Sequence, residues 1–163
     1  MGTSVICPGS FDPVTLGHID IISRASRMFD HVIVAVLVNP AKEKPSFSID
    51  ERIYLLREAT KDLKNIEIDS FDGLLADYAK KRQVTAIVKG LRAVSDFEYE
   101  FQMSLTNKML NPGLETIFLT AEAKYMYLSS SMVKQVASFG GDIKGFVPDC
   151  VLDKIVERLS TKR

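Results

Sequence analysis

Five short stretches of the chain carry apolar residues in the patterns typical of β-strands. His31–Val38 is a nearly continuous run of apolar residues, many of them β-branched, whereas residues 65–70 alternate, with Ile66 and Ile68 on one side. The other three stretches are short apolar runs at residues 4–8, 84–88 and 115–119. Strands that are apolar along most of their length suit a parallel sheet covered on both faces. The pattern therefore predicts a buried, five-stranded parallel sheet.

Helical patterns lie between these stretches. Residues 17–29 place apolar side chains on one face at helical spacing, and Ser48 with Glu51 forms a capping box that opens a second helix. Further helices are predicted at residues 73–82, 96–110, 129–139 and 148–159. The alternation of strand and helix predicts an α/β fold. We expect a Rossmann-like, doubly wound, five-stranded parallel sheet with helices on both faces, in one domain over residues 1–163.

This fold class limits where the chemistry can lie. In doubly wound sheets the ligand binds outside the carboxyl ends of the strands, at the point where the strand order reverses. The segments that follow the predicted strands are residues 8–18, 39–47, 71–75, 89–92 and 120–131. Candidate functional residues are therefore sought in these five segments.

Composition narrows the class of protein. Lys and Arg number 21, and so do Asp and Glu, so the formal net charge is zero and a nucleic-acid-binding protein is disfavoured. The two cysteines lie near opposite ends of the chain and form no zinc motif. No apolar run approaches the ~20 residues of a membrane helix, and no secretory signal is visible. We expect a cytoplasmic protein that has no membrane partner.

The exit of the first strand is the first candidate site. Gly9 would let the backbone approach a ligand closely, and Gly17 and His18 open a helix whose amides point toward an anion. The imidazole of His18 could donate a hydrogen bond to a phosphate oxygen. A histidine that only caps the helix or lies on the surface is the alternative. The position of His18 at the first strand–helix junction favours function.

The exit of the fourth strand carries two cations. Lys89 and Arg92 flank Gly90, and an arginine can hold a phosphate with two parallel hydrogen bonds. The alternative is an ordinary solvated loop. Asp96, Glu98 and Glu100 follow, but alternate residues on a helix do not converge, so no metal site is predicted there. Asp96 and Glu98 are interpreted as helix-start and surface charges.

Two more segments complete the set of candidates. Three serines, residues 129–131, begin a helix after the fifth strand and supply hydroxyls, a cap and amides for an anion. Lys42 lies in a loop after the second strand that is rich in proline and charge. Taken alone, Lys42 is more easily explained as a solvated lysine.

Together these segments resemble a known family. The chain carries GSFDP at residues 9–13, TLGH at 15–18, KGLRAVSDFEYE at 89–100 and LSSS at 128–131. In this order and spacing they are similar to the bacterial phosphopantetheine adenylyltransferases of the nucleotidyltransferase superfamily, over about residues 4–159. The resemblance implies transfer of an adenylyl group from ATP to 4′-phosphopantetheine, with Mg²⁺, to give dephospho-CoA and pyrophosphate. It also implies a homohexamer and makes feedback by CoA plausible.

The resemblance also implies roles for individual residues. Phosphopantetheine would be held by Ser10, Lys42, Leu75 and Lys89. ATP would be held by Ser10, Phe11, His18, Gly90, Leu91, Arg92, Glu100, Tyr125, Met126, Tyr127, Leu128, Ser129, Ser130 and Ser131. His18 would stabilise the transition state at the α-phosphate, with Lys42 and Arg92 as further catalytic residues. No protein ligand to the metal is assigned.

The chain departs from the family pattern at two positions. Lys89 stands where the family usually has arginine, and Lys134 stands where the wider superfamily often has arginine. Two other functions stay open. One is a non-catalytic nucleotide-binding module on the same fold, which the presence of His18, Lys42, Lys89 and Arg92 disfavours. The other is a sibling transferase that uses nicotinamide or glycerol phosphates, which the segment at residues 89–100 disfavours.

Overall fold

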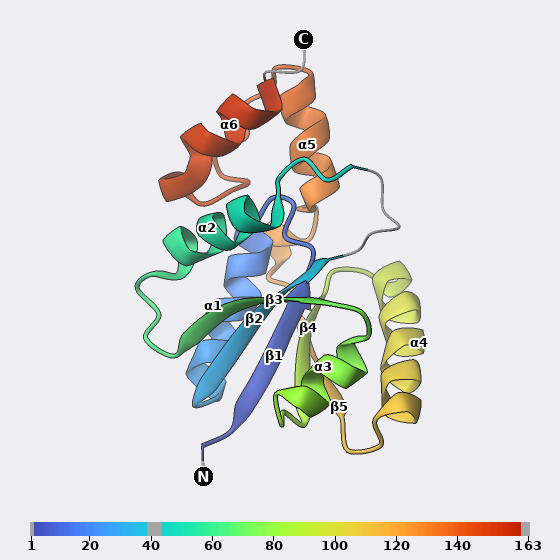
Figure 1. The fold of residues 1–163 in the computed structure, drawn as a ribbon. Coiled ribbons are helices and arrows are strands. Elements are labelled where there is room, and N and C mark those ends of the chain that lie inside the picture. The colour runs from blue at the N-terminus through green and yellow to red at the C-terminus, as the bar shows by residue number, and fades with distance from the viewer. Residues whose placement is uncertain (1, 39–43, 161–163) are drawn as a thin grey trace.

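The computed structural model describes residues 2–38 and 44–160. Its sheet is parallel throughout and has the strand order β3-β2-β1-β4-β5, which confirms the predicted Rossmann-like fold class (Figure 1). The strands are β1 (Ser4–Gly9), β2 (His31–Val38), β3 (Ile66–Asp72), β4 (Ala86–Leu91) and β5 (Glu115–Thr120). The helices are α1 (Leu16–Met28), α2 (Ile49–Thr60), α3 (Leu75–Lys81), α4 (Val94–Leu110), α5 (Ser130–Ser138) and α6 (Leu152–Ser160), with short 3₁₀ turns at Ala123–Tyr125 and Asp149–Val151.

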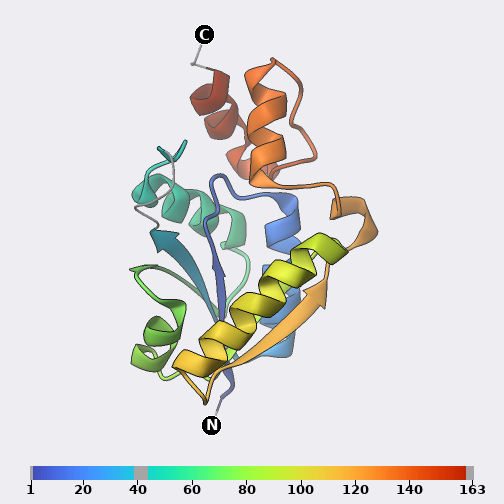
Figure 2. The same cartoon turned by 90° about the vertical axis from the view of Figure 1, so that its right-hand side faces the viewer.

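The two faces of the sheet bury alternate residues of the same strands. Val5 and Val34 belong to the larger core cluster, with side chains of α1 and α2, whereas Ile6 and Ile33 belong to a smaller cluster with α3. The crossover from β3 to β4 reverses direction along the sheet, so α3 and α4 lie on the face opposite α1 and α2. Helices α5 and α6 lie together beyond the carboxyl end of the sheet (Figures 1 and 2).

The five predicted strands and six predicted helices are all present, with shifted ends. One correction concerns the fourth strand, predicted at residues 84–88, which spans Ala86–Leu91. It continues through Lys89 and Gly90 because β5 pairs with it as far as Leu91 and Thr120. Lys89 and Gly90 therefore lie within the strand and not in a loop after it. Helix α4 likewise begins at Val94, two residues before the predicted start.

A crevice forms where the strand order reverses. Strand β1 is in register with β2 along its whole length, but it pairs with β4 only at Ile6 and Ile87. The carboxyl halves of β1 and β4 therefore separate, and α1 packs against the gap. A Cβ atom at Gly90 would lie 2.7 Å from Cγ1 of Ile21, so this close approach of strand and helix requires glycine.

No helix within residues 2–38 and 44–160 is both long enough and apolar enough to cross a membrane.

Candidate active site

A cleft of about 500 Å³ opens at the carboxyl ends of β1 and β4. It is lined from four segments that are distant in sequence, namely the exits of β1 and β4, the first turns of α4, and the turn into α5. Most of the predicted site residues lie in its lining: Ser10, Phe11, His18, Lys89, Gly90, Arg92, Glu100, Tyr125, Leu128, Ser129, Ser130 and Ser131. The structure thus brings together residues that span more than a hundred positions of the chain.

A few predicted residues lie elsewhere. Leu91, Met126 and Tyr127 are not in the lining, and the Tyr127 ring instead lies 5.6 Å from that of Phe146. Leu75 packs against the core cluster beneath α3. Lys42 lies outside the described residues. The ligand contacts assigned to these positions stay predictions.

His18 is held by the turn that begins α1. The Thr15 side chain accepts a hydrogen bond from the His18 backbone N–H at 3.3 Å, and the Thr15 N–H donates to Nδ1 of His18 at 3.0 Å. This reciprocal pair is a capping box, and His18 also lines the cleft, while its hydrogen bond to a phosphate stays a prediction. Because Nδ1 accepts, the ring proton lies on Nε2.

The environment of His18 keeps its ring neutral. Burial lowers the pKa of His18 to about 4, and the nearby cations Arg92 and Lys89 act in the same direction. At neutral pH the side chain is therefore an uncharged imidazole that can donate from Nε2. A neutral donor beside two cations suits an anionic ligand, because the cations supply the charge and the imidazole supplies a directed hydrogen bond.

The turn before α1 is braced by two buried charged residues that the sequence interpretation missed. Arg52 of α2 donates to the Ser10 carbonyl at 2.8 Å, and Asp12 accepts from the backbone N–H groups of Ser46 and Phe47 at 3.1 and 2.8 Å. Both charged side chains are buried. Their signal in the sequence was weak, because one arginine on a helix and one aspartate before a proline are common on surfaces.

Phe11 takes an unusual backbone conformation in the same turn. Its φ is +48°, in the left-handed region that most residues avoid, and its ring lies 5.0 Å from that of His18. A Cβ atom at Gly9 would lie 3.0 Å from the Phe11 ring. The ring therefore fills the space over Gly9, and the turn is closed by local packing as well as by Arg52 and Asp12.

The opposite wall of the cleft consists of ion pairs. Nζ of Lys89 lies 3.3 Å from Oε1 of Glu100, and Nε of Arg92 donates to Oδ2 of Asp96 at 3.0 Å. Asp96 and Glu100 pair with different cations and Glu98 is exposed, so the three carboxylates do not converge on one site, as predicted. Asp96 and Glu100 are one helical turn apart, so both side chains reach the cleft. The interpretation of Asp96 as a mere helix-start charge was incomplete.

The serine turn is partly used by the fold. Ser129 is the N-cap of α5 and accepts from the Met132 N–H at 3.0 Å, and the Ser130 hydroxyl donates to the Pro13 carbonyl at 2.7 Å. Nζ of Lys134, one turn further along α5, lies 3.3 Å from Oδ2 of Asp12. These contacts join α5 to the turn before α1, and the start of α5 faces the cleft.

The floor of the cleft is apolar. Cys7, Ile21, Ile22 and Val88 line it, and burial raises the pKa of the Cys7 thiol to about 12, so this thiol stays protonated. Sequence reasoning assigned these positions to strands and helix without a role in the site. They border the cleft because β1 and β4 separate there, and they stay buried in the core.

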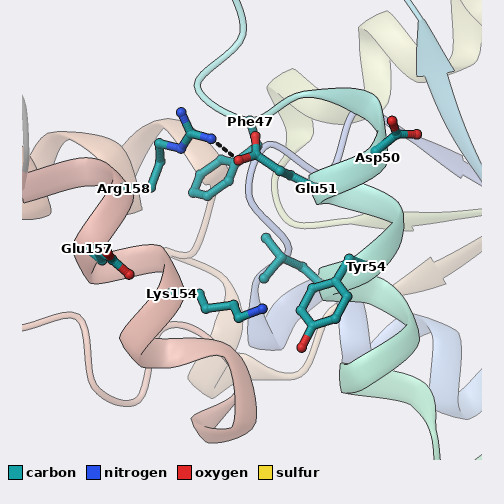
Figure 3. A pocket seen from close by; sticks show the side chains of 8 residues that line it. Phe47, Asp50, Glu51, Tyr54, Lys154, Glu157 and Arg158 are labelled. Carbon is teal, nitrogen blue, oxygen red and sulfur yellow. Dashed lines mark ion pairs between the residues drawn. The ribbon is translucent and has the colours of Figure 1, made fainter.

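A second, larger cavity of about 690 Å³ lies between α2 and α6 (Figure 3). Its cations already have partners, because Arg158 forms an ion pair with Glu51 and Lys154 lies 3.7 Å above the Tyr54 ring. It touches no strand end. The cleft at the strand ends is therefore the candidate active site.

Residues 6–136 match the cytidylyltransferase-like family. The chain is 64% identical over 153 residues to a phosphopantetheine adenylyltransferase from Caldanaerobacter subterraneus subsp. tengcongensis, covering 94% of this chain and 95% of that one. It is 57% identical over 157 residues to a protein of the same name from Dictyoglomus turgidum, covering 96% and 98%. A third protein of this name, from Clostridium tetani, is 56% identical with the same coverage.

The fold is also found in a solved structure of low sequence identity. The crystal structure of a putative nicotinate-nucleotide adenylyltransferase from Vibrio parahaemolyticus superposes with a TM-score of 0.67 at 18% identity, covering 98% of this chain and 99% of that one. This likeness shows the shared architecture alone. The full-length identities above 50%, together with a cleft lined by residues of the TLGH, KGLR and LSSS motifs, show that the chain belongs to the phosphopantetheine adenylyltransferase family of the nucleotidyltransferases.

Proposed function

We propose that this chain transfers the adenylyl group of ATP to the phosphate of 4′-phosphopantetheine, giving dephospho-CoA and pyrophosphate in a reversible reaction of coenzyme A biosynthesis. The observation that carries the proposal is the meeting of His18, Lys89, Arg92 and the start of α5 around one cleft. These groups are a neutral hydrogen-bond donor, two cations and a helix N-terminus, which together suit a chain of phosphates.

The reaction needs no base to create its nucleophile. The acceptor phosphate is already an anion, so catalysis consists of aligning it with the α-phosphorus of ATP and neutralising the charge that develops there. The Nε2–H of His18 would donate to an α-phosphate oxygen as negative charge grows on it. Arg92 and the start of α5 would hold the β- and γ-phosphates, which leave as pyrophosphate.

The acceptor side is assigned to Lys89, with Ser10, Lys42 and Leu75 as further contacts by resemblance. Lys89 lies at the carboxyl edge of the sheet, and its ammonium pairs with Glu100 within the cleft. An incoming phosphate would have to compete with that carboxylate for the lysine. Glu100 and the segment 125–131 are assigned to ATP by the same resemblance.

Mg²⁺ would enter with the nucleotide. The described residues contain no group of three or more His, Cys, Asp or Glu side chains arranged around a metal site. Mg²⁺ commonly binds through substrate phosphates and water with one or two carboxylates. A cleft without a cluster of protein ligands therefore fits a metal carried by ATP. The ion would neutralise phosphate charge beside Arg92.

We also propose a homohexamer in the cytoplasm, with feedback by CoA, as the family resemblance implies. The support for self-association is α4, where large apolar side chains are exposed at Val94, Phe97, Tyr99, Phe101, Met103, Leu105, Met109 and Leu110. We expect light scattering to give a mass well above the 18.2 kDa of one chain. A monomer at micromolar concentration that still turns over would contradict the hexamer.

The proposed function is tested by product identification. Purified protein is incubated with ATP, Mg²⁺ and 4′-phosphopantetheine, and dephospho-CoA is sought by mass spectrometry together with released pyrophosphate. A parallel panel offers nicotinamide mononucleotide with ATP and glycerol 3-phosphate with CTP. Dephospho-CoA from the first mixture alone is the expected result. Turnover only in the panel favours a sibling transferase, and nucleotide binding without any product favours a non-catalytic module.

A further inference from the structure

The guanidinium of Arg92 is held on two sides. Nε and Nη2 donate to the two carboxylate oxygens of Asp96 at 3.0 and 3.3 Å, and Nη1 donates to the Leu128 carbonyl at 2.7 Å. These bonds use three of the five N–H groups of the arginine. One N–H on Nη1 and one on Nη2 are left for another acceptor.

This arrangement joins the two parts of the cleft that can receive an anion. Leu128 directly precedes the N-cap of α5, so its carbonyl ties Arg92 to the start of that helix. Asp96 lies in the first turn of α4 and lines the same cleft. Figure 2 shows the start of α4 beside the connection that leads into α5. The orientation of Arg92 is therefore set by contacts from two separate elements.

A carboxylate at this position has an electrostatic disadvantage. Asp96 brings a negative charge into a cleft that suits phosphates, and like charges repel at short range in a partly buried site. Its charge alone would weaken anion binding. Its two hydrogen bonds with Arg92 instead fix the orientation of the guanidinium plane, whereas a solvated arginine would take many orientations.

We propose that Asp96 is a positioning residue, which orients Arg92 so that its remaining N–H groups meet the β- and γ-phosphates that leave as pyrophosphate. The inference rests on the proposed adenylyl transfer. The role proposed for Asp96 predicts different effects on two quantities, the affinity for a phosphate anion and the turnover. Removal of the carboxylate charge should leave the affinity for a phosphate anion unchanged or higher, while loss of orientation should lower turnover, because alignment contributes mainly in the transition state.

The test compares two variants of Asp96 with one matched control. Asp96→Asn keeps the shape and removes the charge, Asp96→Glu keeps the charge and shifts the carboxylate, and Glu98→Gln removes a charge from an exposed position of the same helix. For each, kcat and KM for ATP are measured, and inorganic pyrophosphate binding is measured by calorimetry. Thermal unfolding shows whether each variant is folded.

We expect Asp96→Asn and Asp96→Glu both to lower kcat at least tenfold, while Asp96→Asn binds pyrophosphate at least as tightly as the original protein. Glu98→Gln should change neither quantity more than twofold. In a double-mutant cycle, Asp96→Asn should have little further effect on kcat when Arg92→Lys is already present, because lysine has no fork to orient.

Three outcomes would overturn the inference. These are an unchanged kcat in both Asp96 variants, an Asp96→Glu variant as active as the original, or effects of Asp96→Asn and Arg92→Lys that simply add. If Asp96→Asn does not fold, Asp96→Glu and the cycle built on it decide the question. Absence of dephospho-CoA with the original protein contradicts the proposed function, whereas an active original protein with unaffected variants contradicts only the role of Asp96.

Discussion

The two walls of the cleft are built in different ways. The wall from β1 and α1 is neutral, and its parts are close in sequence: Thr15 and His18 cap each other three residues apart. The wall from β4 and α4 is charged, and its cations Lys89 and Arg92 are each held by a carboxylate from the next helix. The first wall is organised by local hydrogen bonds, and the second by a balance of charges that a ligand can change.

The comparison shows how the cleft can combine a precisely placed hydrogen-bond donor with cations. A neutral imidazole can be fixed by backbone hydrogen bonds at little electrostatic cost, so it suits the point where a single donor must be aimed. Cations aimed at phosphate need neutralisation while the cleft is empty, and the carboxylates of α4 provide it. Among the described residues, the lining of the larger cavity between α2 and α6 contains no imidazole, and its Arg158 and Lys154 contact Glu51 and Tyr54 of α2.

Loss of His18, which belongs to the neutral wall, should have the largest effect on turnover. We expect His18→Ala to lower kcat by about 10²–10³, which corresponds to about 2.7–4 kcal/mol of barrier for one lost donor to developing charge. Steady-state kinetics measure this, with thermal unfolding as the control for folding. A well-folded His18→Ala protein with near-original turnover would show that the neutral wall does not contact the reacting phosphate.

Loss of Lys89 tests the charged wall. We expect Lys89→Ala to raise the KM for phosphopantetheine much more than that for ATP, by an amount that corresponds to roughly 1.5–3 kcal/mol for a charge-assisted contact. The change also leaves Glu100 without its lysine, which adds repulsion toward the acceptor phosphate. Lys89→Arg should be tolerated, and unchanged phosphopantetheine kinetics in Lys89→Ala would move the acceptor phosphate to another cation.

The contact between the two walls is tested at Gly90. A methyl group there would meet Cγ1 of Ile21 at 2.7 Å, so we expect Gly90→Ala to lower the free energy of unfolding by about 1–3 kcal/mol. Chemical denaturation measures the change. Gly113→Ala serves as the control, because its nearest contact would be at 3.7 Å. Equal stabilities of the two variants would mean that α1 can move away from β4.

The last expected effect is the pH dependence of stability that arises from His18. Its pKa is near 4 in the folded chain and near 6.5 when unfolded, so the unfolded chain binds more protons between these values. The contribution of His18 to the free energy of unfolding is fully present above pH 6.5. It falls as the pH drops toward 4, by at most about 1.4 kcal/mol per pH unit. Chemical denaturation of the original protein and of His18→Gln is measured at pH 7 and at pH 5. The difference between the two proteins in the stability lost at pH 5 gives the contribution of His18. An equal loss in both would contradict a neutral, partly buried His18.

Local patterns in the sequence were enough to predict much of the neutral wall. The strand before it and the helix after it follow from hydrophobic spacing, and Thr15 and His18 are within reach because they lie on one turn. The capping box at Ser48 and Glu51 was predicted on the same grounds and is present. Interactions between residues three or four apart depend mainly on helical geometry, which the local sequence specifies.

The charged wall could be predicted only in part. Lys89 and Arg92 were identified from their place after the fourth strand, but that strand extends to Leu91 because its partner β5 continues beside it. Asp96 was interpreted as a helix-start charge, because its role depends on the direction in which α4 leaves the sheet. The bracing roles of Arg52 and Asp12 were not predicted, since their partners lie more than thirty residues away.

By itself, the sequence determined the strand–helix alternation, the edge of the sheet where chemistry lies, and the family motifs that meet there. Only the tertiary structure decided that β1 and β4 separate, that Asp96 and Glu100 turn into the cleft, and that Arg52 and Asp12 brace its first turn. The physical reason is the distance along the chain over which each kind of interaction acts. Periodicity and capping act within one or two turns of chain, whereas ion pairs and buried hydrogen bonds depend on which distant segments the packed core brings side by side.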